Sequence, residues 1–226
     1  MSDRISSQNK TKTMVSLAML CAIAYAVMAM CKVIPPIAGF LSLDLKDTII
    51  AIGGFIFGPL AALLVSIVVS VLEFLTVSDT GPIGLIMNII ATAAFVCPAT
   101  FLYRRRRNLS SAVIGLLSGV ICLTTVMILW NYLITPLYLT VPREVVVDMI
   151  VPILLPFNLI KGFMNAALTM LLYTPIVGAL RKAHLVPSHE EASDTPKGKF
   201  HWGPVILALL VLATAILFAL VMMDII

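Results

Sequence analysis

Seven apolar segments, separated by short polar or proline-containing stretches, constrain this chain more than any other feature of its sequence. Most of them are about 20 residues or longer, the length that an α-helix needs to cross the hydrocarbon core of a bilayer. Every backbone polar group in that core must be hydrogen-bonded within the protein, and a helix meets this requirement by itself. The sequence therefore predicts an all-α integral membrane protein with helices at residues 14–34, 48–57, 59–75, 82–103, 111–139, 151–180 and 202–223.

The composition supports a membrane protein and excludes several other classes. Of the 226 residues, 61% are hydrophobic and 12% are charged, whereas a soluble domain is nearer one half apolar and about one quarter charged. The net charge of +4 comes from basic residues at segment ends, so we expect no nucleic-acid partner. The four cysteines are scattered through apolar segments without a CxxC pair, and we therefore expect neither a disulfide framework nor a metal site.

The polar stretches divide the chain into four parts. We expect a cytosolic N-terminal tail at residues 1–13, a six-helix membrane domain at 14–182, a cytosolic linker at 183–201 and an additional transmembrane helix at 202–226. Within the membrane domain, the pair Gly58-Pro59 divides a long apolar span into two helices, because glycine and proline end helices.

The basic residues also predict the orientation, since cytoplasmic loops carry an excess of lysine and arginine. The four arginines at 104–107, the pair Arg181-Lys182 and the basic residues of the N-terminal tail all face one side if the six segments cross in turn. We therefore expect a multi-pass protein of the plasma membrane with a cytoplasmic N-terminus.

Intramembrane polar residues gather in the outer half of this predicted topology. A charged side chain in hydrocarbon is costly and is rarely present without a partner, a polar cavity or a function. Because a channel needs polar groups through the full depth of the membrane, a one-sided set predicts a pocket that opens to the outside, with three loops above it (39–47, 77–82 and 140–148) positioned as lids. The set comprises Ser66, Ser70, Glu73, Asn88, Thr92, Asn131, Thr135, Asn158, Lys161, Asn165 and Thr169.

Each of these residues also has a purely structural interpretation. Asn88 and Asn131 could hydrogen-bond neighbouring helices, and Glu73 could be a solvated carboxylate at the interface. Lys161 could extend its ammonium toward the interface or form an ion pair with Glu73 or Asp148. The charges of the first loop, Asp44, Lys46 and Asp47, resemble helix-capping residues, because Asp47 precedes Thr48 at a predicted helix start.

The first segment carries a different feature, a stripe of small residues. Ala18, Ala22 and Ala26 recur every four residues, which places them on one face of a helix where another helix can approach closely. This stripe is compatible with packing inside the protein or with docking to a partner membrane subunit.

Several stretches together resemble the substrate-binding S components of energy-coupling factor (ECF) transporters, specifically the riboflavin-binding branch. The resemblance covers about residues 14–182. It rests on the alanine stripe of the first segment and on the stretches 43–47, 52–61, 80–84 with Asn88, 131–132 with 135–138, and 156–162.

The resemblance implies a six-helix protein that captures a vitamin from outside the cell, without being an enzyme and without a cofactor. It implies riboflavin as the ligand. The candidate binding residues are Asn131, Asn158, Lys161, Asn88 and Leu43, which lie in the resembling stretches, and Glu73, which comes from the predicted pocket alone. The resemblance also implies that Ala18, Ala22 and Ala26 face a transmembrane coupling subunit, which works with two cytosolic ATPases. The chain has no GxxxxGK[ST] phosphate loop, so the ATP-derived energy must come from such partners.

Two features leave alternatives open. Glu73 would also suit a cationic vitamin such as thiamin, so an S component for thiamin, folate or a similar vitamin remains an alternative, and the seventh segment is absent from the six-helix pattern. An intramembrane enzyme would require paired acids or a metal set at depth, and all three histidines lie in the predicted linker instead. A structural or assembly protein would have no use for a polar pocket in its outer half.

Overall fold

The chain folds into an all-helical bundle, as the sequence predicts. The computed structural model describes residues 2–37, 39–77, 81–183, 185 and 202–222. Within these ranges the helices are α1 (Ser2–Cys31), α2 (Lys46–Phe57), α3 (Pro59–Thr76), α4 (Gly81–Arg106), α5 (Leu109–Leu139), α6 (Arg143–Met149), the π-helical turn η1 (Ile150–Leu154), α7 (Leu155–Lys182) and α8 (Trp202–Met222).

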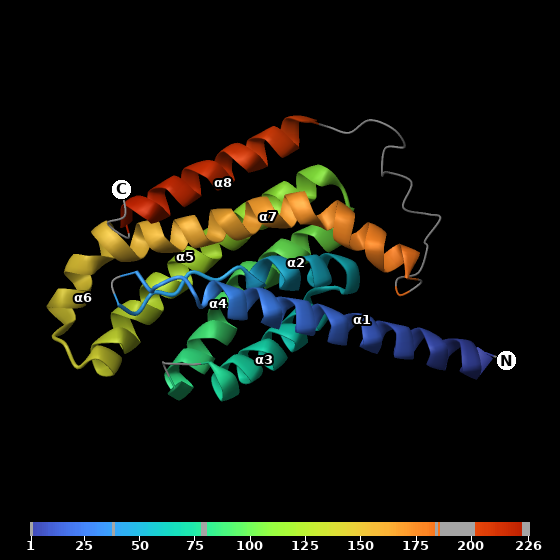
Figure 1. The fold of residues 1–226 in the computed structure, drawn as a ribbon, viewed down its shortest axis with the longest axis horizontal. Coiled ribbons are helices and arrows are strands. Elements are labelled where there is room, and N and C mark those ends of the chain that lie inside the picture. Colours follow the sequence, from blue (N-terminus) through green and yellow to red (C-terminus); the bar gives the residue numbers. More distant parts are fainter. Residues whose placement is uncertain (1, 38, 78–80, 184, 186–201, 223–226) are drawn as a thin grey trace.

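Successive helices run in alternate directions along the long axis of the molecule (Figure 1). The segments α6, η1 and α7 follow one another without a loop and form a single membrane crossing, with its bend at η1. Counted in this way, six helices form the bundle and α8 is the seventh, which agrees with the predicted architecture. The start of α1 and the ends of α4 and α7 lie at the same end of the bundle (Figure 1).

Local sequence accounts for most of the helix boundaries. Gly58 separates α2 from α3 with φ of 98°, a conformation that favours glycine, and Pro59 then opens α3 at a position where its missing N–H costs nothing. Asn108 caps α5, because its side-chain oxygen accepts a hydrogen bond from the Ser111 N–H at 2.8 Å. The start of α1, by contrast, is not explained by local sequence. This helix begins at Ser2, and it includes the polar residues that precede the apolar run predicted from residue 14.

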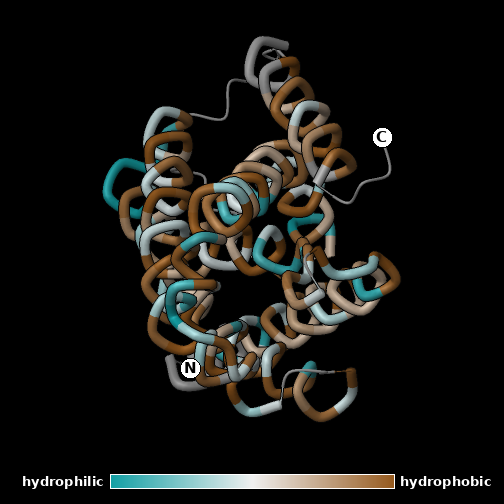
Figure 2. Tube along the Cα trace, turned by 90° about the vertical axis from the view of Figure 1, so that its left-hand side faces the viewer, coloured by the Kyte–Doolittle hydropathy of each residue, from teal (hydrophilic) through white to brown (hydrophobic). Residues whose placement is uncertain are grey.

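The outer surface has the character of a membrane protein. Among the described residues, five segments are long and apolar enough to cross a bilayer. Hydrophobic residues dominate the helices around the bundle (Figure 2). Many large apolar side chains are exposed, among them Leu64, Leu75 and Ile121, as expected for helices that face lipid. By contrast α2, with 12 residues, is almost completely buried among the longer helices.

The close contact between α4 and α5 depends on two glycines that the sequence-based prediction overlooked. Gly115 and Gly119 stand four apart on α5, the spacing that lets two membrane helices approach closely. A Cβ atom at Gly115 would lie 2.6 Å from the carbonyl oxygen of Ala99 on α4. At Gly119 it would overlap the carbonyl oxygen of Phe95. The backbones of the two helices are therefore in direct contact.

We predict that Gly119→Ala destabilises the bundle by about 1–3 kcal/mol, because the added methyl group forces α4 and α5 apart. The matched control is Gly178→Ala on α7, where a Cβ atom has nothing within 4 Å. The control should be neutral or slightly stabilising, since alanine favours a helix over glycine. Thermal unfolding in detergent compares the two variants, and equal melting temperatures would refute close packing of the two backbones.

The seventh helix packs on the outside of α7. Ala208 and Ala215 of α8 are buried, and Ala215 belongs to a cluster with Ile160 and Met164 of α7 against which Leu212 also packs. In Figure 1, α8 and α1 lie on opposite sides of the bundle. The face of α1 that carries the alanine stripe is therefore not covered by α8.

Candidate functional site

A cavity with both apolar and polar lining residues lies at the end of the bundle opposite the arginine-rich end of α4. Its walls come from the end of α1, the loop between α1 and α2, the end of α3, the first half of α4, the middle of α5 and the start of α7. The lining residues are Met28, Cys31, Lys32, Phe40, Leu41, Ser42, Leu43, Asp44, Glu73, Met87, Asn88, Ala91, Leu123, Met127, Phe157, Asn158 and Lys161. The cavity therefore lies in the half of the bundle that the sequence predicts.

Five of the six predicted ligand-binding residues line this cavity. They are Leu43, Glu73, Asn88, Asn158 and Lys161, which come from the first loop, α3, α4 and α7. Asn158 donates to the Leu154 carbonyl oxygen at 2.7 Å. Within the part of the chain that the structure describes, the Asn88 side chain makes no hydrogen bond to another residue, so its amide is free to serve a ligand.

The structure does not bring Asn131 to the cavity wall. Asn131 is buried on α5, where its Nδ2 donates to the Met127 carbonyl oxygen at 2.7 Å and its Oδ1 accepts from Thr135 Oγ1 at 2.8 Å. Met127, one turn earlier on α5, does line the cavity. A ligand would have to reach one helical turn further along α5 to contact Asn131.

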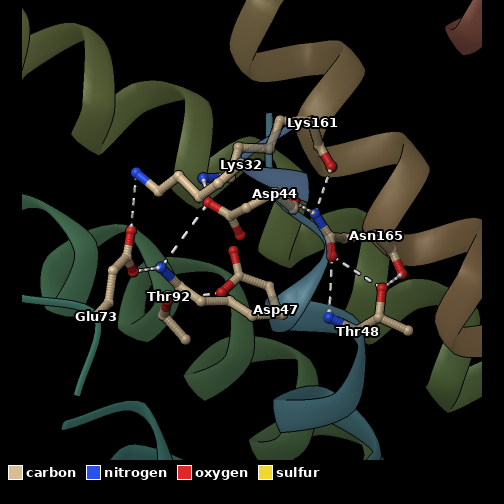
Figure 3. Close-up of polar contacts among 9 residues, drawn as sticks. Lys32, Asp44, Asp47, Thr48, Glu73, Thr92, Lys161 and Asn165 are labelled. Atoms are coloured by element: carbon tan, nitrogen blue, oxygen red, sulfur yellow. Dashed lines mark hydrogen bonds and ion pairs between the residues drawn. The ribbon is translucent and has the colours of Figure 1, made fainter. Parts of the chain in front are cut away.

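A chain of ion pairs crosses the site, and all of its members except the half-buried Lys32 are buried (Figure 3). It joins α7 to the first loop, the start of α2, the end of α3 and the residue after α1. Lys161 Nζ lies 2.8 Å from Asp44 Oδ2, Lys46 Nζ lies 2.6 Å from Glu73 Oε2 and 3.8 Å from Asp44 Oδ2, and Lys32 Nζ lies 3.5 Å from Glu73 Oε1. The partner of Lys161 is therefore Asp44, rather than the Glu73 or Asp148 considered from the sequence.

The loop charges do not act as helix caps, contrary to the interpretation from the sequence. The residue before α2 is Leu45, and it makes no side-chain capping hydrogen bond. Asp47 lies inside α2, and its Oδ1 accepts a hydrogen bond from Thr92 Oγ1 of α4 at 2.6 Å. Buried charges are stable only when they are paired. Residues of α3, α4 and α7 pair with these charges, so the charges can lie inside the bundle.

Asp44 is the central member of the network. Burial alone would raise the pKa of this loop carboxyl, but the ammonium groups of Lys161 and Lys46 outweigh burial and lower the pKa to about 2. Asp44 is therefore ionised at neutral pH. Its second oxygen, Oδ1, is buried and has no hydrogen-bond partner among the described residues, so this acceptor is available to a group that enters the cavity.

Among the described residues of the three predicted lids, those of the α1–α2 loop line the cavity and the others do not. The α1–α2 loop contributes Phe40, Leu41, Ser42, Leu43 and Asp44 to the wall. None of the described residues of the other two loops, 77–82 and 140–148, lines the cavity, and residues 78–80 lie outside the described ranges. Most of the second of these two loops is instead helical, as α6.

Sequence reasoning missed four lining residues that matter chemically. Phe40 and Phe157 supply aromatic surfaces, Lys32 supplies an ammonium and Asp44 supplies a carboxylate. Lys32 and Asp44 lie in or beside the first loop, and only the three-dimensional structure shows that they turn inward. Phe157 could have been found, because it precedes Asn158 at the start of α7.

The free space in the cavity is small. It measures about 50 Å³, whereas pockets for drug-sized ligands usually enclose ~300–1,000 Å³. A vitamin-sized molecule would therefore enter only if part of the wall moves. The α1–α2 loop is the wall element without a regular helix, which makes it the part best suited to that movement.

An all-helical membrane protein with a cavity of apolar and polar side chains under a loop at one end has features expected of a solute-binding protein. The model of the family described as "ECF transporter, substrate-specific component" matches residues 12–173 of this chain. The chain therefore belongs to the family of substrate-specific components of ECF transporters. Because members of this family are transporter components, the prediction that the chain is not an enzyme is confirmed.

Individual relatives agree with the family. The chain is 29% identical over 188 residues to the riboflavin transporter FmnP of Bacillus subtilis, covering 78% of this chain and 99% of that protein. It is 30% identical over 182 residues to the riboflavin transporter RibU of Staphylococcus aureus, covering 78% and 96%. The solved S component of a bacterial ECF transporter superimposes with a TM-score of 0.65 at 31% identity, over 76% of this chain and 99% of that structure.

Proposed function

We propose that this chain is the riboflavin-capturing subunit of an ECF transporter. The observation that carries the proposal is the pair of relatives that are riboflavin transporters and match almost over their whole lengths. The cavity supports it chemically. An isoalloxazine ring has a polar edge, which amides and an ammonium can bind, and flat apolar faces, which aromatic and aliphatic side chains can cover.

Each part of the cavity has a role in this proposal. Asn158 and Asn88 bind polar groups of the ring or the ribityl chain, and Lys161 donates hydrogen bonds to ligand oxygens. Leu43, Phe40 and Phe157 cover the apolar faces. Glu73 acts through its ion pairs with Lys46 and Lys32, so it needs no cationic ligand as a partner. Riboflavin is the transported ligand here, and no cofactor is involved.

The remaining parts of the proposal concern the membrane and the partners. The C-terminal ends of α4 and α7, which carry the arginine and lysine clusters, face the cytoplasm together with the N-terminus. The cavity at the other end therefore opens to the outside of the plasma membrane. The six-helix domain is taken as residues 14–182, with a cytosolic tail before it. The proposed linker at 183–201 lies almost entirely outside the described residues, and the helix after it supplies an additional crossing. A coupling subunit and two ATPases supply the energy for uptake.

Flavin colour tests the ligand directly. Protein purified from cells grown with riboflavin should show flavin absorbance near 450 nm (~0.1–1 flavin per chain), because a ligand held under the loop survives purification when its dissociation is slow. Denaturation should release a compound with the mass of riboflavin. Colourless protein that releases another vitamin would contradict the proposal.

We predict that Ala22→Leu on α1 prevents assembly with the coupling subunit without affecting flavin binding. Ala18, Ala22 and Ala26 are all exposed on one face of α1, and a leucine there keeps a second helix from approaching closely. Co-purification with the coupling subunit and ATPases measures assembly. The matched control is Ala213→Leu on the exposed face of α8, which should assemble normally. Normal assembly of both variants would rule out α1 as the docking face.

A further inference from the structure

The first turn of α2 is capped by a residue on a different helix. The first N–H groups of a helix lack partners within the helix and are normally satisfied by a nearby side chain. Leu45 at the start of α2 makes no side-chain cap, and its backbone carbonyl oxygen accepts a hydrogen bond from the Thr48 N–H at 3.2 Å. The same N–H also donates to Asn165 Oδ1 of α7 at 2.9 Å, and Thr48 Oγ1 donates to that oxygen at 2.8 Å. The cap of α2 is thus 117 residues away in sequence.

The other end of the same amide holds the loop that precedes α2. Asn165 Nδ2 donates to the Asp44 carbonyl oxygen at 3.2 Å and to the Lys161 carbonyl oxygen at 3.0 Å (Figure 3). The nitrogen of the Asn165 amide must face the two carbonyl oxygens and its oxygen must face the Thr48 N–H. These requirements allow only one orientation of the amide. Asn165 is 1% exposed, so water does not compete for these bonds.

Asp44 is therefore attached to α7 at two points. Its carboxylate binds the Lys161 ammonium, and its backbone carbonyl binds Asn165, one helical turn further along α7. Asp44 and Lys161 line the cavity, whereas Asn165 does not. Asn165 thus acts on the cavity through the residues that it holds.

We propose that Asn165 is a positioning residue, which docks the α1–α2 loop on α7 and thereby places Asp44 beside Lys161 over the ligand cavity. Without its amide, the loop keeps the Lys161–Asp44 ion pair and its apolar contacts with α7 but loses its hydrogen bonds to Asn165, and it opens more often. The consequence for flavin dissociation rests on the proposed function. The consequence for loop opening does not, because it concerns the protein without ligand.

Loop opening can be measured by cysteine labelling at Leu41, which is buried in the loop and lines the cavity. The background replaces the four native cysteines by alanine, and Leu41→Cys introduces the reporter. In ligand-free protein, Asn165→Leu should raise the rate of maleimide labelling roughly tenfold, which corresponds to about 1.4 kcal/mol. In the same variant, riboflavin should dissociate faster by a similar factor while its association rate changes little.

Thr169→Val is the matched control. Thr169 Oγ1 donates to the Asn165 carbonyl oxygen at 2.6 Å from the same buried face of α7, so this variant also loses one buried hydrogen bond but leaves the Asn165 amide intact. Its labelling rate should equal that of the parent. If Asn165→Leu does not fold, Thr48→Val, which removes only the two hydroxyl bonds to Asn165, should still raise the labelling rate severalfold.

Three results decide the matter. Faster labelling in the Asn165 or Thr48 variant than in the Thr169 control supports the positioning role. Labelling rates equal to that of the control in every folded variant overturn it. Faster labelling without any riboflavin binding by the parent supports the positioning role and refutes the proposed ligand, so the two failures are distinguishable.

Discussion

Lys161→Met is expected to weaken riboflavin binding by roughly 10- to 150-fold, which corresponds to the loss of a charged hydrogen bond of about 1.5–3 kcal/mol. Lys161 lines the cavity from α7 and its ammonium already lies at hydrogen-bond distance from the loop. The substitution removes the donor to the ligand and the attachment of the loop at the same time. Quenching of riboflavin fluorescence by purified protein measures the dissociation constant.

Lys182→Met is the matched control for this variant. Lys182 lies in the last turn of the same helix, exposed and at the opposite end from the cavity. The control should bind riboflavin like the parent protein. If Lys161→Met also binds within twofold of the parent, Lys161 is not a ligand contact and the site is misassigned.

Asp44→Leu is expected to lower the free energy of unfolding by about 3–5 kcal/mol, because it leaves the Lys161 ammonium buried without its counter-charge. Removing both charges, with Asp44→Leu and Lys161→Met together, should restore most of this stability, since paired buried charges are often replaceable by apolar residues. The double variant should nevertheless bind riboflavin no more tightly than Lys161→Met alone. Thermal unfolding in detergent and the fluorescence titration separate the two effects.

Asp148→Leu serves as the control for the loss of a carboxylate. Asp148 lies exposed on α6, so its replacement should change stability by less than about 0.5 kcal/mol. A double variant that is no more stable than Asp44→Leu alone would mean that the two residues contribute independently. The ion pair would then not be the link between the loop and α7.

The helices could be predicted well from the sequence because the membrane imposes a simple rule on them. Apolar length predicted the crossings, and the break at Gly58-Pro59 is where the structure has it. The one-sided cavity was also predictable, since polar side chains in the outer half of several membrane helices are stable only where they line a cavity or pair with one another. The start of α1 was misplaced, because hydropathy cannot show a helix that continues through polar residues.

The ion pairs and hydrogen bonds within the site could not be predicted from the sequence. Lys161 had several acidic candidates, and its actual partner, Asp44, is 117 residues away in sequence. The same loop charges looked like helix caps, while the real cap of α2 came from Asn165 on α7. Such contacts depend on how α7 lies against the start of α2, which no local pattern encodes. The glycine pair of α5 had a recognisable spacing and was simply overlooked.

Capture of riboflavin in a single cavity at one end of the bundle is the proposal on which the other roles depend. A fluorescence titration of the flavin-free protein with riboflavin, in the presence and absence of excess thiamin, examines it without relying on any substitution. We expect saturable quenching at about one riboflavin per chain, unaffected by thiamin, with a dissociation constant below roughly 1 μM, or about −8 kcal/mol. Absence of saturable quenching, or its loss when thiamin is added, would refute riboflavin capture by this chain.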